Sequence, residues 1–315
     1  MTQIDPLALK GLTTYSLKDR PSKVSHQDFA RPWTKGGSFK QFLEGLPNIL
    51  AGQSLREIAA AWAGARRDGR PVLLGMGAHP LKVGLAPVLI DLLKRGLITG
   101  LAVNGAVIIH DSEIAMVGRT SEDVDQVLGS GQFGMARETA EFLNDATSRG
   151  ARAGLGLGQA VGQQLLQSDF SYKHLSLLAS AADLKVPVTV HVAEGTDIIH
   201  LHPSCNPAAL GETTHLDFRL FAAQVSHLSG GLYINLGSAV ILPEVFLKAL
   251  TLARNLGHRV EPLTTVNLDF IQHYRPLTNV VRRPTAGAGR GYALTGHHEI
   301  MLPLLAGLVV ESLEV

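Results

Sequence analysis

Two segments far apart in the chain share the pattern of a buried strand, a glycine turn and a helix. The turns contain Gly77 and Gly237. The expected strand and helix of each segment are 72–74 with 83–94, and 231–236 with 244–255. A glycine turn between a strand and a helix leaves backbone N–H groups free, and open α/β sheets bind nucleotides and other anions there. The pattern therefore predicts an anion site on an α/β sheet.

Short apolar strands alternate with helices along the rest of the chain. We expect strands at 98–103, continuing to 107–109, and at 187–191 and 261–266. We expect helices at 55–67, 110–118, 156–167, 175–184, 216–228 and 300–313, and further helical segments within 124–142 around Gly129 and Gly131. Strands made of continuous apolar runs are typical of parallel sheets that helices cover on both faces. The sequence therefore predicts an α/β fold with a mainly parallel, doubly covered sheet.

The domain organisation follows from where prolines and glycines gather. Residues 1–45 are irregular, which predicts an N-terminal extension that lies over a surface or over a neighbouring subunit. No break in composition divides the rest of the chain, and no repeat is present. We therefore expect residues 46–315 to form a single α/β domain.

Charge and cysteine content exclude several classes of protein. The chain has 28 Lys and Arg against 27 Asp and Glu, so no net field attracts nucleic acid or anionic lipid. Its single cysteine, Cys205, excludes an internal disulfide framework and a cysteine-rich zinc site. The N-terminus lacks a signal-peptide pattern, and the apolar run 300–310 is too short to span a bilayer. We expect a cytoplasmic protein that acts on a small molecule.

Glycine, amide and carboxylate residues follow several of the expected strands, where a cofactor would bind. The spacing after the first strand is not G-x-G-x-x-G, so the standard dinucleotide fingerprint is missing. For each group the alternative is a tight turn or a helix cap. The candidate cofactor-binding residues are Gly77, His79, Gly84, Asn104, Gly105, Glu113, Glu194, Asp197, Gly237 and Ser238.

A polar stretch over 269–298 is the candidate catalytic loop, because long polar loops in compact domains are usually functional or disordered. Its histidines and tyrosine are candidate general acids or bases, and its arginines are candidate anchors for carboxylate or phosphate. The alternative is a surface or subunit-contact loop. The candidate catalytic residues are His273, Tyr274 and His298, with Arg275, Arg282 and Arg290 as anchors.

A metal site is the alternative chemistry. His200 and His202 alternate along the chain, and alternating histidines on a strand share one face. No H-E-x-x-H or C-x-x-C motif accompanies them, so the signal for a metal-dependent hydrolase or lyase is weak. Further candidate ligands are His191, His215, His227, His297, His298 and Glu299.

These groups, in this order, resemble deoxyhypusine synthase over roughly residues 70–313. The matching stretches are Gly77-Ala-His-Pro-Leu-Lys-Val-Gly84 through Ala106, His110-Asp-Ser-Glu113, Val188–Asn206, Gly230–Gly257, and Pro303-Leu-Leu with Glu311. The resemblance implies a Rossmann-like NAD-binding fold. It also implies a homotetramer with active sites between subunits, and a transferase that oxidises spermidine through a lysine imine.

The sequence differs from that family in the residue that carries out the family's reaction. The only lysine after residue 185 is Lys248, whereas the family's lysine belongs in the later loop, where this chain has arginines. Arginine stays protonated and forms no imine. We therefore expect an NAD-binding oxidoreductase or transferase for a small substrate, with anions as a candidate substrate class, and not a deoxyhypusine synthase. The second alternative is a non-catalytic nucleotide-binding protein that kept the fold.

Overall fold

The structure, a computed structural model, describes residues 4–313, and the chain divides into two compact units, Met1–Gln53 and Ser54–Val315. The first unit contains the short helices η1 (Leu17–Asp19), η2 (His26–Asp28) and α1 (Phe39–Gly45). Helix α2 (Leu50–Arg67) begins in the first unit and continues into the second. The expected boundary between residues 45 and 46 stays a prediction. Among the described residues, no helix is long and apolar enough to cross a membrane.

The second unit is built on a six-stranded sheet in which every strand is parallel to its neighbours. The strands are β1 (Val72–Met76), β2 (Gly100–Asn104), β3 (Val188–His191), β4 (Leu232–Leu236), β5 (Leu263–Asp269) and β6 (Gly289–Thr295). Their order is β3-β2-β1-β4-β5-β6, which is the order of a Rossmann-like fold. The expected α/β fold is therefore confirmed.

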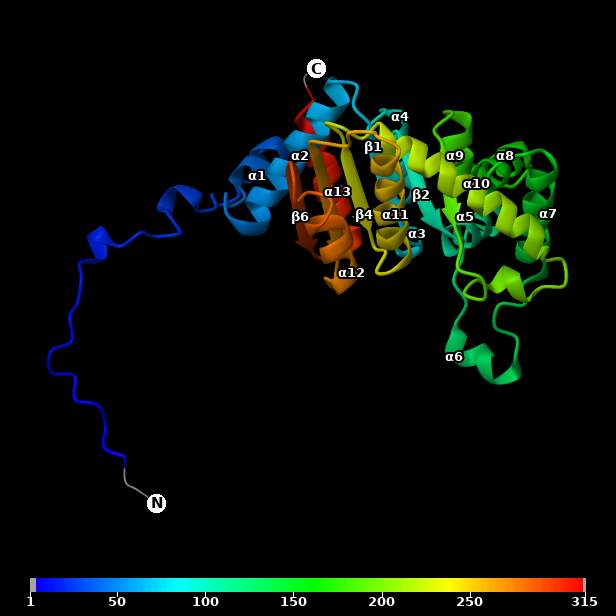
Figure 1. Cartoon of the computed structure of the whole chain (residues 1–315). Coiled ribbons are helices and arrows are strands. Elements are labelled where there is room, and N and C mark those ends of the chain that lie inside the picture. The colour runs from blue at the N-terminus through cyan, green and yellow to red at the C-terminus, as the bar shows by residue number, and fades with distance from the viewer. Residues whose placement is uncertain (1–3, 314–315) are drawn as a thin grey trace. The chain divides into compact units, whose positions relative to one another are not determined.

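Helices cover both faces of this sheet, with α11 on one face and α13 on the other (Figure 1). The α-helices after α2 are α3 (His79–Lys82), α4 (Ala86–Lys94), α5 (Gly105–Val117), α6 (Val124–Val127), α7 (Arg137–Arg152), α8 (Leu157–Gln167), α9 (Leu177–Asp183), α10 (Pro207–Ser226), α11 (Ile241–Asn255), α12 (Tyr274–Pro276) and α13 (His298–Glu311). Single turns are η3 (Leu128–Ser130), η4 (Lys173–Leu175) and η5 (Ile198–Leu201), and η6 (Leu277–Arg282) is a π-helix.

The core on the α11 face is centred on two aromatic rings. Tyr233 of β4 and Phe246 of α11 stack with ring centroids 3.7 Å apart, and both are fully buried. Gly75 of β1 leaves room for the Tyr233 ring, since a Cβ there would lie 2.2 Å from the hydroxyl oxygen. All five residues of β1 and of β4 are buried, as expected for central strands of a covered sheet.

Three expectations about secondary structure are wrong. Residues 107–109 do not continue β2, because Asn104 caps α5 there: its side chain accepts a hydrogen bond from Val107 N at 3.3 Å. Helix α10 begins at Pro207 and not at 216, because Asn206 caps it. Residues 269–298 are not a polar loop, since they contain the π-helix η6 and strand β6. Strand β6 was missed because it is an edge strand in which only Leu294 is buried.

Candidate functional site

The two glycine turns lie next to each other at the point where the strand order reverses. Strand β1 pairs with both β2 and β4, so the turns after β1 and β4 share the carboxyl edge of the sheet. Gly77 N donates to Leu236 O at 3.2 Å. A Cβ on Gly77 would lie only 2.5 Å from Gly237 O. The turns are therefore in direct contact at the topological switch point, where sheets of this kind bind ligands.

The turn after β4 presents a row of backbone N–H groups without an acceptor. In the part of the chain that the structure describes, Ser238, Ala239 and Val240 donate no backbone hydrogen bond. Gly237 adopts a left-handed conformation with φ of 63° and directs the chain into the 15-residue helix α11. The turn after β1 adds the N–H groups of Ala78 and His79, which also lack an acceptor among residues 4–313. Free N–H groups at the start of a helix favour an anion.

Asparagines on two neighbouring strands hold the turn after β4 in place. Asn235 and Asn267 are paired in the register of β4 and β5, and both are fully buried. Asn235 Nδ2 donates to Ser238 O at 2.9 Å and to Asn267 Oδ1 at 2.7 Å. Asn267 Nδ2 then donates to Gln272 Oε1 at 2.7 Å. The network joins the turn after β4 to the segment after β5.

Two histidines from distant parts of the chain meet above the glycine turns. His79 Nδ1 and His298 Nδ1 lie 2.8 Å apart. His298 Nε2 lies 3.3 Å from Leu268 O and 3.6 Å from Asp269 Oδ1. His298 is fully buried and packs on Gly237, where a Cβ would lie 2.7 Å from the ring. Burial lowers the pKa of His298, and His79 adds to this effect while Asp269 opposes it.

Phe270 covers this histidine pair. Its ring centroid lies 5.5 Å from that of His79 and 5.9 Å from that of His298. The predicted cofactor residues Gly77, His79 and Gly237 thus lie together with the predicted catalytic residue His298. From the sequence, the first three are candidate cofactor residues and His298 is a candidate catalytic residue. The fold brings all four together.

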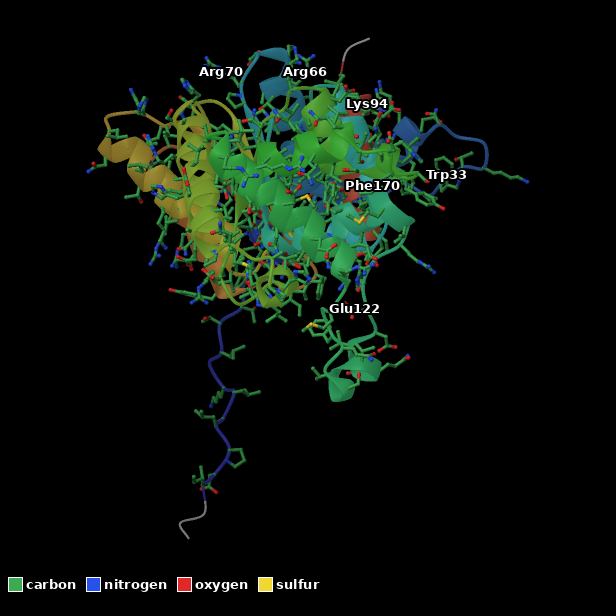
Figure 2. All side chains as sticks on the ribbon, turned by 90° about the vertical axis from the view of Figure 1, so that its right-hand side faces the viewer. Trp33, Arg66, Arg70, Lys94, Glu122 and Phe170 are labelled. Carbon is green, nitrogen blue, oxygen red and sulfur yellow. The ribbon has the colours of Figure 1, made fainter. Side chains whose placement is uncertain are left out.

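Another group of predicted cofactor residues surrounds a cavity of about 200 Å³ beyond β2. Asp197 lies against the first residue of α5, since a Cβ on Gly105 would be 2.0 Å from its carboxylate. Burial raises the pKa of Asp197, and His200 opposes the effect. The residues that line the cavity include Lys82, His110, Glu113, Glu122, Thr196 and Asp197. Glu122 lies where the α6 segment leaves the rest of the unit, at the opposite end from Arg66 and Arg70 (Figure 2).

Glu113 is held within this cavity by two threonines. Thr120 Oγ1 donates to one of its carboxylate oxygens, and Thr139 Oγ1 donates to the other at 3.2 Å. Because the Thr120 hydroxyl proton goes to Glu113, His110 Nδ1 must donate to Thr120 Oγ1, 2.6 Å away. Burial, with a contribution from Lys82, lowers the pKa of His110 to about 4. A neutral His110 is consistent with this arrangement.

The predicted arginine anchors do not come together. Arg275 Nε lies 3.4 Å from Glu244 Oε1 in the first turn of α11. Arg282 is exposed at the end of η6. Arg290 lies at the amino end of β6, opposite Thr264, and pairs with Glu57. A strand rises about 3.3 Å per residue, so Arg290 is roughly 16 Å from the carboxyl end of β6.

The remaining predicted site residues are dispersed. His273 and Tyr274 follow β5 and are exposed, with 71% of Tyr274 accessible. Glu194 is exposed in the turn after β3. Gly84 has φ of 81° in the turn between α3 and α4, where only glycine fits without strain.

Sequence reasoning missed Asn235, Asn267 and Gln272. A signal was present, since both strands carry an Asn followed by Leu inside an otherwise apolar run, as Ile-Asn-Leu and Val-Asn-Leu. An amide in a buried strand needs hydrogen-bond partners, and two such strands predict that the amides pair.

The histidines of the metal alternative take other roles. His200 Nδ1 accepts from Gly195 N at 3.1 Å, and His202 Nδ1 lies 2.7 Å from Ser204 Oγ. The two belong to the end of η5 and not to a strand face. Within residues 4–313, no group of three or more His, Cys, Asp or Glu side chains could hold a metal ion.

No protein-family model and no curated protein matches the sequence. Solved structures nevertheless share its fold. A candidate LOR/SDH protein from Methanococcus maripaludis S2 has a TM-score of 0.53 and 14% identity, over 84% of this chain and 70% of that one. AgrE, in a ternary complex with ornithine and NAD+, has a TM-score of 0.53 and 12% identity, over 82% of this chain and 33% of that one. A candidate deoxyhypusine synthase from Entamoeba histolytica has a TM-score of 0.53 and 10% identity, over 90% of this chain and 97% of that one.

At these identities the likeness shows a shared fold alone. The chain spans 31% of the length of ArgZ, an arginine dihydrolase from the ornithine-ammonia cycle in cyanobacteria, and 33% of the length of AgrE. The expected resemblance to deoxyhypusine synthase therefore holds at the level of the distant fold, and one structure of this fold has been solved with NAD+ bound.

Proposed function

We propose that the protein is an NAD-binding enzyme, an oxidoreductase or transferase that acts on a small molecule at the carboxyl edge of its sheet. The contact between the glycine turns after β1 and β4, at the reversal of strand order, is the observation that carries this proposal. Dinucleotides bind at that point in sheets with this strand order. The complex of AgrE with NAD+, in a protein of the same fold, supports the same cofactor.

The residues at the two turns fit the phosphates of a dinucleotide. The N–H groups of Ser238, Ala239 and Val240 lie at the start of α11 and have no acceptor among the described residues. Gly77 keeps the backbone close to them, because any side chain there would strike Gly237 O. Bound NAD would supply a hydride acceptor. The carboxylate of Asp197, at the cavity beyond β2, is our candidate for contacts with ribose hydroxyls.

We do not propose that the protein synthesises deoxyhypusine. Lys248 lies on α11, with 58% of its side chain exposed, and its ammonium is paired with Glu244. An imine-forming lysine is typically desolvated in a pocket, whereas Lys248 lies at the surface in an ion pair. Of the three arginines expected to select an anionic substrate, only Arg275 lies near the start of α11. Of these three arginines, Arg275 is therefore the one that supports an anionic substrate in our proposal.

Calorimetric titration with NAD+ tests the proposal. We expect saturable binding by the wild-type protein, and a loss of about tenfold or more in affinity in Ala239→Asp, since its carboxylate would occupy the N–H groups and repel phosphate. Asp is favourable at the start of a helix, so this variant should fold. Thr251→Asp adds the same charge to the same helix, about 18 Å further along, and should bind NAD+ as the wild type does.

Absence of binding by the wild-type protein at millimolar NAD+ would contradict the proposal. Binding without turnover of any alcohol or amine would favour a non-catalytic nucleotide-binding protein. We also propose a homo-oligomer, with the tetramer and the sites between subunits that the resemblance implies as its candidate form. Light scattering on the purified protein measures the subunit number directly.

A further inference from the structure

The hydrogen bonds around His298 determine which of its nitrogens carries the proton. Leu268 O is a carbonyl oxygen and only accepts, so His298 Nε2, 3.3 Å away, is the donor. The same oxygen also accepts from Gly237 N at 3.1 Å. In a neutral imidazole one nitrogen carries the proton and the other has a lone pair. The Nδ1 atom of His298 is therefore an acceptor.

His79 must then donate from its own Nδ1. The two Nδ1 atoms are 2.8 Å apart, which is hydrogen-bond distance, and one of them must carry a proton. Since His298 Nδ1 is the acceptor, His79 Nδ1 is the donor, and His79 Nε2 is left with a lone pair. The carbonyl of Leu268, two hydrogen bonds away, thus determines which nitrogen of His79 carries the proton.

The arrangement holds only while His298 stays neutral. A second proton would make His298 Nδ1 a donor, so His79 could keep the hydrogen bond only by accepting at Nδ1 and carrying its own proton on Nε2. His298 is fully buried, and this burial lowers its pKa. The charged groups that face it are Asp269 and Glu299, which oppose the shift, while His79 adds to it. His297 lies outside the pair, with its ring stacked on Phe270 at 6.2 Å.

We propose that His79 is the proton acceptor of the reaction, and that His298 is a positioning residue that keeps His79 Nε2 unprotonated. This inference rests on the proposed NAD-dependent function. A substrate alcohol or amine would lose a proton from oxygen or nitrogen to His79 Nε2, and a hydride from carbon to the nicotinamide of NAD+. The substrate is then oxidised by two electrons to a carbonyl or an imine, and the imidazolium returns its proton to solvent.

The tautomers are measurable without any nucleotide or substrate. Long-range ¹⁵N–¹H NMR spectra separate protonated from unprotonated imidazole nitrogens, and His79→Asn and His298→Asn assign the two rings. We expect His79 to be protonated at Nδ1 and bare at Nε2, and His298 to show the reverse. A wild-type His79 protonated at Nε2 would overturn the inference.

A matched pair of variants isolates the role of His298. His298→Asn places an amide oxygen near the former Nδ1 and keeps an acceptor for His79, whereas His298→Leu removes it. We expect the Asn variant to keep the wild-type tautomer of His79, and the Leu variant to shift toward protonation at Nε2. Circular dichroism checks that both are folded. An unchanged His79 tautomer in folded His298→Leu would contradict the positioning role; if that variant unfolds, the comparison of wild type with His298→Asn still applies.

NAD+ titration separates this inference from the proposed function. His79→Asn keeps the backbone N–H of residue 79 and a donor to His298 and lacks Nε2, so its affinity for NAD+ measures whether the imidazole itself contacts the cofactor. A loss of tenfold or more would make His79 a cofactor contact and overturn its role as a base. A wild-type protein that fails to bind NAD+ would overturn the proposed function and the proton transfer with it, while the measured tautomers would stand.

Discussion

Asn235 donates a hydrogen bond of 2.7 Å to Asn267 across neighbouring strands in the middle of a buried sheet. Two amides in such a place are stable only because each finds partners, and these partners are the turn after β4 and the segment after β5. The pair therefore connects the packing of the sheet to the shape of the candidate cofactor site.

Replacing Asn267 by Ala should destabilise the protein by about 1–3 kcal/mol, because Gln272 Oε1 loses its donor and Asn235 Nδ2 loses one of its two acceptors. The turn at Ser238 loses support as well, so NAD+ affinity should fall. Urea unfolding and calorimetry measure the two effects. Leu256→Ala, at a side chain that is 67% exposed, is the control and should stay within about 0.5 kcal/mol of wild type. Equal stability of the two variants would show that the amide network contributes little.

Gly77→Ala should lower stability by about 1–3 kcal/mol and weaken NAD+ binding, because the new Cβ meets a backbone oxygen that has little freedom to move. The contact would be 2.5 Å to Gly237 O. Gly211→Ala is a matched control, since a Cβ there has nothing within 4 Å and the position lies in α10. That control should gain about 0.5–1 kcal/mol. Thermal and urea unfolding measure both, and a neutral Gly77→Ala would contradict the close contact of the turns.

Asp217 should make the protein less stable as the pH rises. Burial raises its pKa from 3.8 to about 7, against opposing hydrogen bonds from Val190 N and Gly158 N. The folded state then binds more protons than the unfolded state between about pH 4 and 7. The protonated carboxyl of Asp217 makes its full contribution to the free energy of unfolding below pH 4, and this contribution is lost as the pH rises through 7.

The difference in unfolding free energy between wild type and Asp217→Asn measures this effect, since the amide does not titrate. We expect the difference to change in favour of the Asn variant between pH 4 and 7. The comparison is needed because His191, whose pKa burial lowers to about 4, titrates in the same range with the opposite sign. A difference that does not vary with pH would mean that Asp217 is charged throughout.

Lys248→Met should leave both stability and NAD+ affinity nearly unchanged. The ion pair of Lys248 with Glu244 is at the surface, and such pairs contribute about 0–1 kcal/mol. Urea unfolding and NAD+ titration are the measurements. Loss of NAD-dependent turnover in this variant, at unchanged stability, would make Lys248 a candidate catalytic residue.

Much of the candidate site could be predicted from the sequence because its glycines and His79 follow apolar strands. Gly77, His79 and Gly237 stand directly after β1 and β4, and the end of a parallel strand is where such sheets bind ligands. Strand β6 and the position of Arg290 could not be predicted in this way. An edge strand with one buried residue has no apolar run, so its sequence looks like a loop.

The sequence by itself determined the class of the fold and the glycine turns, because apolar runs, glycines and helix caps act over a few neighbouring residues. Only the tertiary structure decided which turns touch. The strand order places β4 beside β1, although 160 positions separate Gly75 from Asn235, its partner in β4. It also brings His298 into contact with His79, 219 positions away. Arg290 lies at the amino end of β6 and therefore at the edge of the sheet opposite the candidate site. These relationships depend on how strands pair and helices pack across the whole domain, and no local pattern encodes them.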